Sequence, residues 1–222
     1  MALGFERLAR QLESFLRGEL SLASAKEEPR LDGEWRGEPA SLASRCYEGP
    51  AVRYGRVTIL AARGVEIASL VFFPRLDRKA PILGADLVEH AQGAGLVVAD
   101  LSPVSEEPDV DAVLSRAAAA LPSAGELPAW AARVFSRTPI FGRVADPDAA
   151  ADAVRTAASA FVSRVRASVP QAAFVESVRA AQSRYVRAHR EDDRALGLVA
   201  KVFGPGPARW YLEEVLFPEV PS

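Results

Sequence analysis

The order of two kinds of sequence pattern constrains the fold of this chain more than any other feature. Between residues 31 and 101, short apolar segments are separated by breaks that contain glycine, which is typical of strands joined by tight turns. After Pro103 the patterns become helical, and they predict helices at 109–121, 146–169, 174–185 and 194–203 and a closing helical segment at 207–216. Strands grouped ahead of helices favour an α+β fold with a mostly antiparallel sheet.

One pair of neighbouring segments predicts a β-hairpin. Residues 57–62 and 65–73 are apolar strand candidates, and the turn between them is Arg63-Gly64. Because side chains alternate across a strand, Val65, Ile67, Ser69, Val71 and Phe73 should share one face of the second strand. Ser69 therefore interrupts a row that is otherwise apolar. Its hydroxyl is either satisfied by the backbone or turned toward a site.

The N-terminal segment predicts a helix followed by a linker. Residues 3–16 carry an apolar stripe at helical spacing, made of Leu8, Leu12, Phe15 and Leu16. Residues 21–29 are polar and end in proline, as expected for a connection into the main body. A chain of 222 residues has the size of one domain with a sizeable core. We therefore expect residues 1–222 to form a single domain, with 1–30 as its N-terminal helix and linker.

Charge and apolar content argue against two classes of protein. The formal net charge of −2 is unlike that of a nucleic-acid-binding domain, which carries a basic surface. No stretch approaches the roughly 18 consecutive apolar residues of a membrane helix. The first residues mix Glu6, Arg7 and Arg10 with apolar positions, unlike a secretory signal. We expect a cytoplasmic protein without nucleic-acid or membrane partners.

The few cysteines and histidines limit metal and redox chemistry. Cys46 is the only cysteine, which excludes an internal disulfide, a thiolate-rich zinc site and a cysteine-ligated iron–sulfur cluster. His90 and His189 are the only histidines and make a poor metal site without cysteine partners. The sequence therefore predicts no bound metal or cofactor, and each histidine is expected to be solvated or hydrogen-bonded.

Two aspartates are candidates for proton chemistry. Asp86 lies in an apolar segment, 81–88, where burial would raise the pKa of its carboxyl group and make it a usable proton donor. The alternative is an aspartate at a strand end that accepts backbone N–H bonds. Asp193 lies in the charged run 190–194 just before an apolar helix, where an acid is favourable next to the helix dipole. Asp100, ahead of a Ser-Pro turn, is expected to hold that loop through its side chain.

Several separated motifs occur in a particular order, and together they resemble the ferredoxin-dependent bilin reductases. The resemblance runs from about Glu34 to Phe217. Its motifs are Phe72-Phe73-Pro74, 81–88, 98–103, Tyr185, Asp192-Asp193, Phe203-Gly204, Ala208, Tyr211 and Leu216-Phe217, with Cys46-Tyr47, Leu127 to Trp130 and Phe135-Ser136 in support.

The resemblance implies a fold and a reaction. The fold would be a three-layer α/β/α sandwich, with a central, mainly antiparallel sheet flanked by helices and the pigment held between the sheet and the C-terminal helices. Biliverdin would be reduced to a phytobilin such as phycocyanobilin by sequential one-electron transfers. The electrons would come from ferredoxin, docked on arginines near the pocket, with no cofactor bound to the enzyme. We expect the enzyme to act as a monomer.

The resemblance also assigns roles to four residues. Asp86 resembles the family's central proton-donating aspartate, and Asp193 resembles a second catalytic acid that lies across the pigment. Ser69 falls at a substrate-binding position, and Arg194 at a position that can meet a propionate of the substrate. Trp130 and Phe135 are expected to belong to the core rather than to stack on the pigment.

Two positions depart from the family pattern. Relatives carry histidine or asparagine where Ser69 falls, and phycocyanobilin-forming relatives carry glutamate on the preceding strand, where this chain has Ile59 or a close neighbour. Neither serine nor isoleucine titrates, so the proton-donating set is reduced to Asp86, aided by Asp193. Two alternatives stay open: a bilin-binding protein without turnover, and a reductase of another linear tetrapyrrole such as a chlorophyll catabolite.

Overall fold

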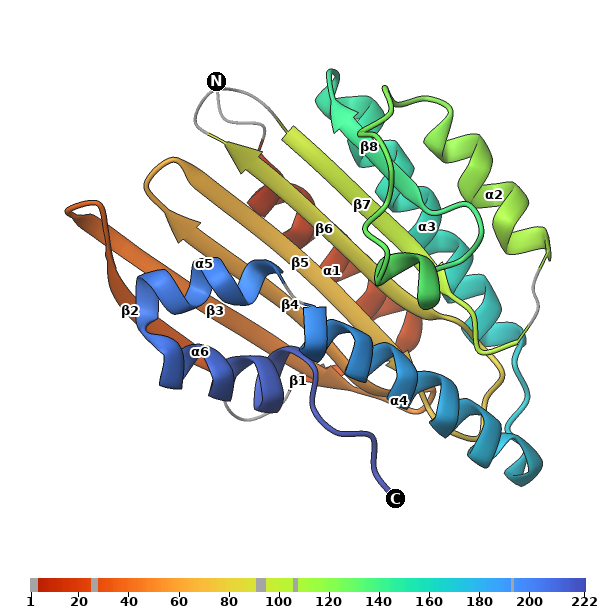
Figure 1. Cartoon of the computed structure of the whole chain (residues 1–222). Helices are drawn as coiled ribbons and strands as arrows, with labels where there is room; N and C mark the ends of the chain where they lie inside the picture. Colours follow the sequence, from red (N-terminus) through yellow and green to blue (C-terminus); the bar gives the residue numbers. More distant parts are fainter. Residues whose placement is uncertain (1–3, 25–27, 91–94, 106–107, 193) are drawn as a thin grey trace.

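A central antiparallel sheet lies between two layers of helices (Figure 1). The computed structural model describes residues 4–24, 28–90, 95–105, 108–192 and 194–222. Within these residues the predicted three-layer α+β architecture is confirmed, and every strand pairing is antiparallel. None of the described helices is both long and apolar enough to cross a membrane.

The sheet has the strand order β1-β3-β4-β5-β6-β7-β8, and β2 also pairs with β3. Its strands are β1 (Ala23–Ser24), β2 (Arg30–Trp35), β3 (Glu38–Glu48), β4 (Val52–Ala62), β5 (Val65–Pro74), β6 (Ile82–His90), β7 (Gly95–Ser102) and β8 (Ile140–Val144). The predicted hairpin is confirmed as β4 and β5, joined at Arg63-Gly64. Gly64 has a φ of 82°, a conformation that glycine adopts without steric cost.

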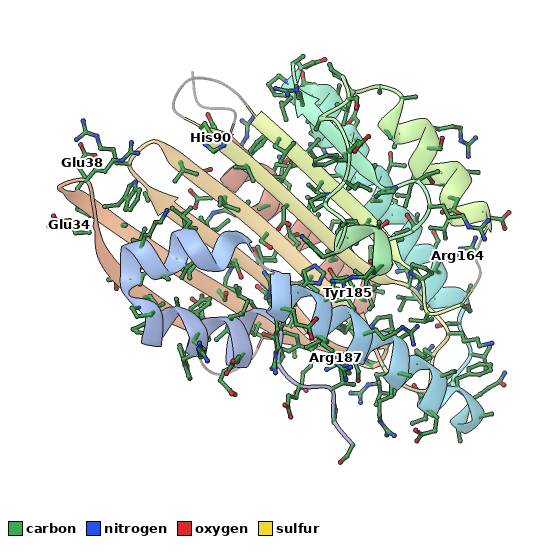
Figure 2. All side chains as sticks on the ribbon, in the orientation of Figure 1. Glu34, Glu38, His90, Arg164, Tyr185 and Arg187 are labelled. Carbon is green, nitrogen blue, oxygen red and sulfur yellow. The ribbon has the colours of Figure 1, made fainter. Side chains whose placement is uncertain are left out.

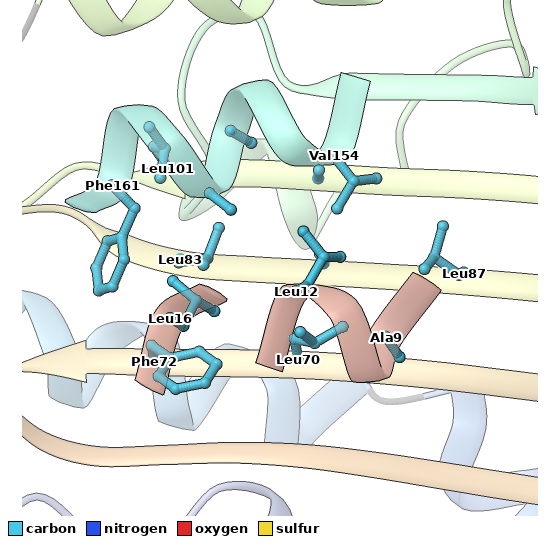
Figure 3. Packing of buried hydrophobic residues seen from close by; sticks show 14 of the residues in the cluster. Ala9, Leu12, Leu16, Leu70, Phe72, Leu83, Leu87, Leu101, Val154 and Phe161 are labelled. Carbon is cyan, nitrogen blue, oxygen red and sulfur yellow. The ribbon is translucent and has the colours of Figure 1, made fainter. Parts of the chain in front are cut away.

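One face of the sheet is covered by α1 (Phe5–Leu20) and α3 (Pro147–Ala167), with α2 (Pro108–Ala118) beside α3 (Figure 1). The helices and the sheet share a large apolar core, in which Phe161 of α3 and Phe72 of β5 are fully buried (Figure 3). Asp146 caps α3 by accepting a hydrogen bond of 3.0 Å from the backbone N–H of Asp148. The described residues of this face form the larger of the two apolar cores.

The opposite face is covered by the C-terminal helices, which lie in front of the sheet in Figure 1. They are α4 (Val175–Asp192), α5 (Arg194–Phe203), α6 (Pro205–Trp210) and a π-helical turn, η3 (Tyr211–Leu216). Two short 3-10 helices, η1 (Ala131–Arg133) and η2 (Ala172–Phe174), complete the described elements. A second apolar cluster joins this layer to the sheet, but it is smaller than the first and leaves a hollow.

Three local predictions were wrong. The segment 140–144 forms β8 in the part of the chain predicted to be helical, because it pairs with the edge strand β7. Part of the predicted linker forms β1, which pairs with β3. Phe15 is 37% exposed, since α1 turns Leu8, Leu12 and Leu16 toward the sheet and leaves Phe15 outside that stripe.

Candidate functional site

A cavity of about 340 Å³ lies between the sheet and the C-terminal helices. Its floor is formed by β4, β5, β6 and β7, and its walls come from α4, the segment 127–135 and the end of η3. Most of the lining is apolar, and its polar side chains are few: Arg56, Thr58, Ser69, Asp86 and His189. A largely apolar pocket with a few convergent polar groups is the usual form of a small-molecule site.

The polar groups of the floor form a row across adjacent strands. Ser44, Thr58, Ser69 and Asp86 occupy directly opposite positions on β3, β4, β5 and β6. Ser44 and Thr58 share a hydrogen bond of 2.6 Å between their hydroxyl groups. Tyr211 extends the row by donating a hydrogen bond of 2.8 Å to Ser44. The row thus links the cavity floor to the C-terminal helical layer.

Asp86 lies in the middle of β6, on the face that points toward the cavity. Leu83, Ala85 and Leu87 are buried on the opposite face among the residues of α1 and α3. Asp86 has exposed surface, and it lines the cavity. Its carboxyl group is nevertheless surrounded by protein atoms, because the cavity lies inside the protein. Burial raises the pKa of Asp86, and the hydrogen bond from Ser69 and the charge of Arg56 offset only part of this effect. A ligand in the cavity can therefore reach a carboxyl group that holds its proton more tightly than usual.

Arg56 is the largest fully buried side chain of the described residues and lies beside Asp86. Its Nε donates to the carbonyl oxygen of Leu216 at 2.8 Å, and its Nη1 lies 3.1 Å from the hydroxyl oxygens of both Thr58 and Ser69. The guanidinium group lies over the ring of Phe217, 5.1 Å from its centroid. Arg56 is thus a fixed positive charge on the cavity floor.

His189 lies in the wall of the cavity and is enclosed by aromatic rings. Its Nδ1 lies 2.9 Å from the carbonyl oxygen of Tyr185 one turn earlier in α4. The rings of Tyr185, Phe217 and Trp130 lie around it, with centroids 4.1, 4.5 and 4.7 Å from the imidazole. Tyr185, labelled in Figure 2, packs edge to face against Phe73 of β5, with ring centroids 5.7 Å apart. Burial lowers the pKa of His189 to about 4, so the imidazole is neutral near neutral pH.

This lowered pKa predicts a pH-dependent stability. In the unfolded chain the histidine binds its proton with a pKa near 6.5, whereas the folded protein resists protonation until about pH 4. The unfolded state therefore binds more protons below pH 6.5, and folding stability falls as the pH is lowered. Between pH 7 and pH 5 we expect the free energy of unfolding to fall by about 2 kcal/mol more in the wild type than in His189→Gln. Urea unfolding at both pH values measures this difference.

The other histidine provides the control for that measurement. His90 lies exposed at the end of β6, away from the cavity (Figure 2). His90→Gln should keep the wild-type dependence of stability on pH. Equal dependence in the wild type and His189→Gln would contradict a buried neutral histidine. The raised pKa values of Asp86 and Asp100 act in the opposite direction but are common to all three proteins.

Trp130 and Phe135 line the cavity, and Phe135 also packs against the second apolar cluster, as expected of a core residue. Their rings meet edge to face, with centroids 5.7 Å apart. Both residues come from the irregular segment between α2 and β8, which folds over the floor beside β7. Both residues are partly buried.

The structure brings two of the four predicted site residues together. Ser69 and Asp86 are opposite each other in register and both line the cavity. Asp193 lies outside the described residues. Arg194 begins α5, and the described side chains do not include its own.

The strand before Ser69 differs from the expectation. Ile59 packs on the opposite face, against the core of α1 and α3, and does not face the cavity. Its neighbours Thr58 and Arg56 occupy the cavity side, with Thr58 directly opposite Ser69. Asp100 behaves as expected of a structural aspartate, since it accepts hydrogen bonds from Ser102 at 2.6 Å and from the backbone N–H of Ser136 at 3.2 Å. It thereby fixes the loop that carries Phe135.

Arg56 and His189 were not identified from the sequence as residues of the cavity. The spacing of each along its strand or helix nevertheless indicates its position. Arg56 has the same parity as Thr58 along β4, so alternation places it on the face that Ser69 shares. His189 follows Tyr185 by four residues, which puts both on one face of α4.

The cavity geometry defines the kind of chemistry that the site can perform. Aromatic walls suit a flat conjugated ligand. A buried cation and a carboxyl group whose pKa is raised by burial lie together on the floor, so charge added to such a ligand can be stabilised and a proton can be supplied to it. Among the described residues, no three His, Cys, Asp or Glu side chains are grouped to hold a metal ion. The fold and the cavity suit a protein that holds a planar ligand against a sheet.

Comparison with known proteins agrees with this description. The family model for ferredoxin-dependent bilin reductase matches residues 6–218. The phycocyanobilin:ferredoxin oxidoreductase of Gloeobacter violaceus is 27% identical over 84% of this chain and 78% of its own length. The corresponding enzyme of Prochlorococcus marinus (strain MIT 9303) is 28% identical over 86% of this chain and 76% of its own length. The crystal structure of tomato phytochromobilin synthase in complex with biliverdin superposes with a TM-score of 0.84, at 18% identity, over 96% of this chain and 82% of that chain.

The chain belongs to the ferredoxin-dependent bilin reductase family. It is accordingly an oxidoreductase of bilins that takes its electrons from ferredoxin.

Proposed function

We propose that this enzyme reduces biliverdin, with Asp86 as the proton donor for the first reduced intermediate. Reduced ferredoxin supplies one electron at a time to the bound bilin, and each electron is followed by a proton. Two electrons and two protons add two hydrogen atoms across one double bond of the bilin. Asp193 is proposed as a second acid, and Arg194 as the partner of a propionate, from their places in the family motif.

The observation that carries this proposal is the environment of Asp86. The carboxyl group lies on the floor of an apolar cavity, where burial raises its pKa and Ser69 hydrogen-bonds to it. A general acid works best when its pKa lies near the working pH, because the group is then both protonated and able to release its proton. Biliverdin is favoured as the substrate because the aromatic walls fit a flat conjugated pigment and because a structural relative was solved with biliverdin bound.

An anaerobic assay tests the proposed function. The purified protein is mixed with biliverdin, and reduced ferredoxin is added in the absence of oxygen. We expect the absorption of biliverdin to change on binding and then to be replaced by that of a reduced bilin, which chromatography identifies. Binding without any loss of biliverdin under reducing conditions would favour the bilin-binding alternative. Failure to bind biliverdin, with turnover of another linear tetrapyrrole, would show a different substrate.

Exposed arginines beside the cavity are proposed to dock ferredoxin. Arg184 of α4 and Arg137 line a surface hollow of about 420 Å³ that shares Phe135 with the cavity. Association of oppositely charged redox partners is steered by such charges and weakens with salt. The charge reversal Arg184→Glu should raise the KM for ferredoxin several-fold, with little change in biliverdin binding.

The matched control lies on the opposite side of the sheet. Arg7 is exposed on α1, and Arg7→Glu changes the net charge of the protein by the same amount. Arg7→Glu should leave the KM for ferredoxin near the wild-type value. Equal effects of the two substitutions would mean that net charge, and not a docking surface at Arg184, controls the encounter.

A further inference from the structure

The positive charge of Arg56 has no carboxylate to neutralise it within salt-bridge distance among the described residues. The contrast is Arg45 on the neighbouring strand β3, which is partly buried and donates to both carboxylate oxygens of Glu13, at 2.7 and 2.5 Å. Arg56 is 2% exposed, and Asp86, the acid that feels its charge, has a raised pKa. Burying an unpaired charge is costly, so a fold that retains one at its ligand cavity has a use for it.

The donors of Arg56 are only partly used. Nε is satisfied by the carbonyl oxygen of Leu216, and Nη1 by the hydroxyl oxygens of Thr58 and Ser69. Nη2 has no hydrogen-bond partner in the part of the chain that the structure describes. Nη2 is not one of the fully buried side-chain atoms that lack a hydrogen bond, so part of its surface is accessible. Arg56 lines the cavity, and we therefore infer that this accessible surface faces the cavity. Two N–H groups of a fixed cation are therefore available to a ligand.

The chemistry of a bilin offers two kinds of acceptor for these donors: lactam carbonyl oxygens and propionate carboxylates. A propionate on the floor would neutralise the charge of Arg56, and as an anion beside Asp86 it would make that carboxyl group hold its proton more tightly. A lactam oxygen carries no full charge. It can accept from Nη2 of Arg56 and from protonated Asp86 together, because Ser69 bridges these two side chains.

We propose that Arg56 binds a lactam oxygen of the bilin and stabilises the negative charge that the first electron adds, an inference that rests on the proposed function. Reduced ferredoxin gives one electron to the bilin, and the charge spreads onto the lactam oxygen beside Arg56. Asp86 then gives its proton to the bilin, and a second electron and proton complete the reduction of the double bond. Arg56 acts as an electrostatic group, distinct from the proton donor.

The potential of the bound bilin tests this role. Arg56→Gln keeps an N–H donor and removes the charge, whereas Arg56→Lys keeps the charge and removes the planar fork. In Arg56→Gln we expect the one-electron reduced bilin to be bound about tenfold to a hundredfold less favourably relative to oxidised bilin. This loss corresponds to a fall of about 59 to 118 mV in the one-electron potential of bound biliverdin. Arg56→Lys should recover most of it. An unchanged potential in Arg56→Gln overturns the proposal.

The dependence of turnover on pH gives a second readout that a purely structural role would not move. Among the side chains that the structure describes, the titratable and charged groups that line the cavity with Asp86 are Arg56 of β4 and His189 of α4. The charge of Arg56 lowers the pKa of Asp86, so its removal raises that pKa further. A proton donor must be protonated, so Arg56→Gln should be slower yet keep its activity to higher pH than the wild type. A slower enzyme with an unshifted alkaline limb would count against the proposal.

Biliverdin dimethyl ester separates the two acceptors. If Arg56 binds a lactam oxygen, the ratio of the Kd values of ester and free acid should be the same in the wild type and Arg56→Gln. A ratio that falls to one in Arg56→Gln would assign Arg56 to a propionate and overturn the proposal. If Arg56→Gln does not fold, infrared spectra of the wild type decide. The lactam C=O stretch should lie below that of biliverdin in an apolar solvent, and an unshifted band would contradict the proposal.

These outcomes are distinct from failure of the proposed function. A wild type that neither binds nor reduces biliverdin removes the substrate assignment itself. A wild type that turns over biliverdin, with Arg56→Gln unchanged in potential and pH dependence, removes only the role of Arg56.

Discussion

Asp86→Asn is expected to slow bilin reduction by about 10²–10⁴-fold, because one positioned proton donor is lost. Asparagine keeps the shape and polarity of the side chain but cannot titrate, so the variant should fold and bind biliverdin. The bound bilin should still accept an electron from ferredoxin and then stall as a radical. Anaerobic absorption and electron paramagnetic resonance after reduction measure the radical, and chromatography measures the product.

A second aspartate on the same face of the sheet provides the control. Asp100 on β7 also has a pKa raised by burial, but it holds Ser102 and Ser136 and does not line the cavity. Asp100→Asn should lower stability without accumulation of a radical. Turnover by Asp86→Asn at the wild-type rate, with the same product, would show that another group donates the proton.

Phe161→Ala is expected to lower the free energy of unfolding by about 3–5 kcal/mol, as large-to-small changes in a closed aromatic core do. The Phe161 ring is fully buried and lies 6.3 Å from the ring of Phe72, between α3 and the sheet. The cavity lies on the other face of the sheet, so the folded variant should bind biliverdin with nearly the wild-type Kd. Urea unfolding and absorption titration measure the two quantities.

The matched change on the cavity side is Phe135→Ala. Phe135 is half-buried and lines the cavity, so its loss should weaken biliverdin binding more than it weakens folding. We therefore expect Phe161→Ala to lower stability with little effect on biliverdin binding, and Phe135→Ala to weaken biliverdin binding with a smaller effect on stability. A tenfold weaker Kd in Phe161→Ala would show that packing behind the sheet also shapes the cavity.

The strongly periodic parts of the fold were predictable from the sequence. The β4–β5 hairpin follows from alternation on both sides of a glycine turn, and α3 follows from Asp146-Pro147 at its start. The strand β8 was not predictable in this way. It is five residues long and is stabilised by pairing with β7, whose paired residues lie 41 to 49 positions earlier and are not revealed by local pattern.

The site was predictable only in part. Alternation placed Ser69 on the correct face, and the motif drew attention to Asp86, but their contact depends on the register between β5 and β6. The predicted strand begins at residue 57, which places Arg56 just outside it, where an arginine is expected to be exposed. In the structure β4 begins at Val52, so Arg56 lies within the strand. Its burial depends on Leu216, and that of His189 on rings from Trp130 and Phe217, all of which are contacts between distant segments.

The dependence of Arg56 on Leu216 has a consequence for synthesis. The two residues are 160 positions apart. At about 5–20 residues per second, a ribosome needs roughly 8–32 seconds to make the carbonyl partner of Arg56 after the arginine itself. During that interval water can hydrate the guanidinium group of Arg56 and the hydroxyl groups of the polar row. That part of the unfinished sheet is then less prone to aggregate than a purely apolar surface. The features that prepare this face for a charged intermediate would thus also protect the nascent chain from aggregation.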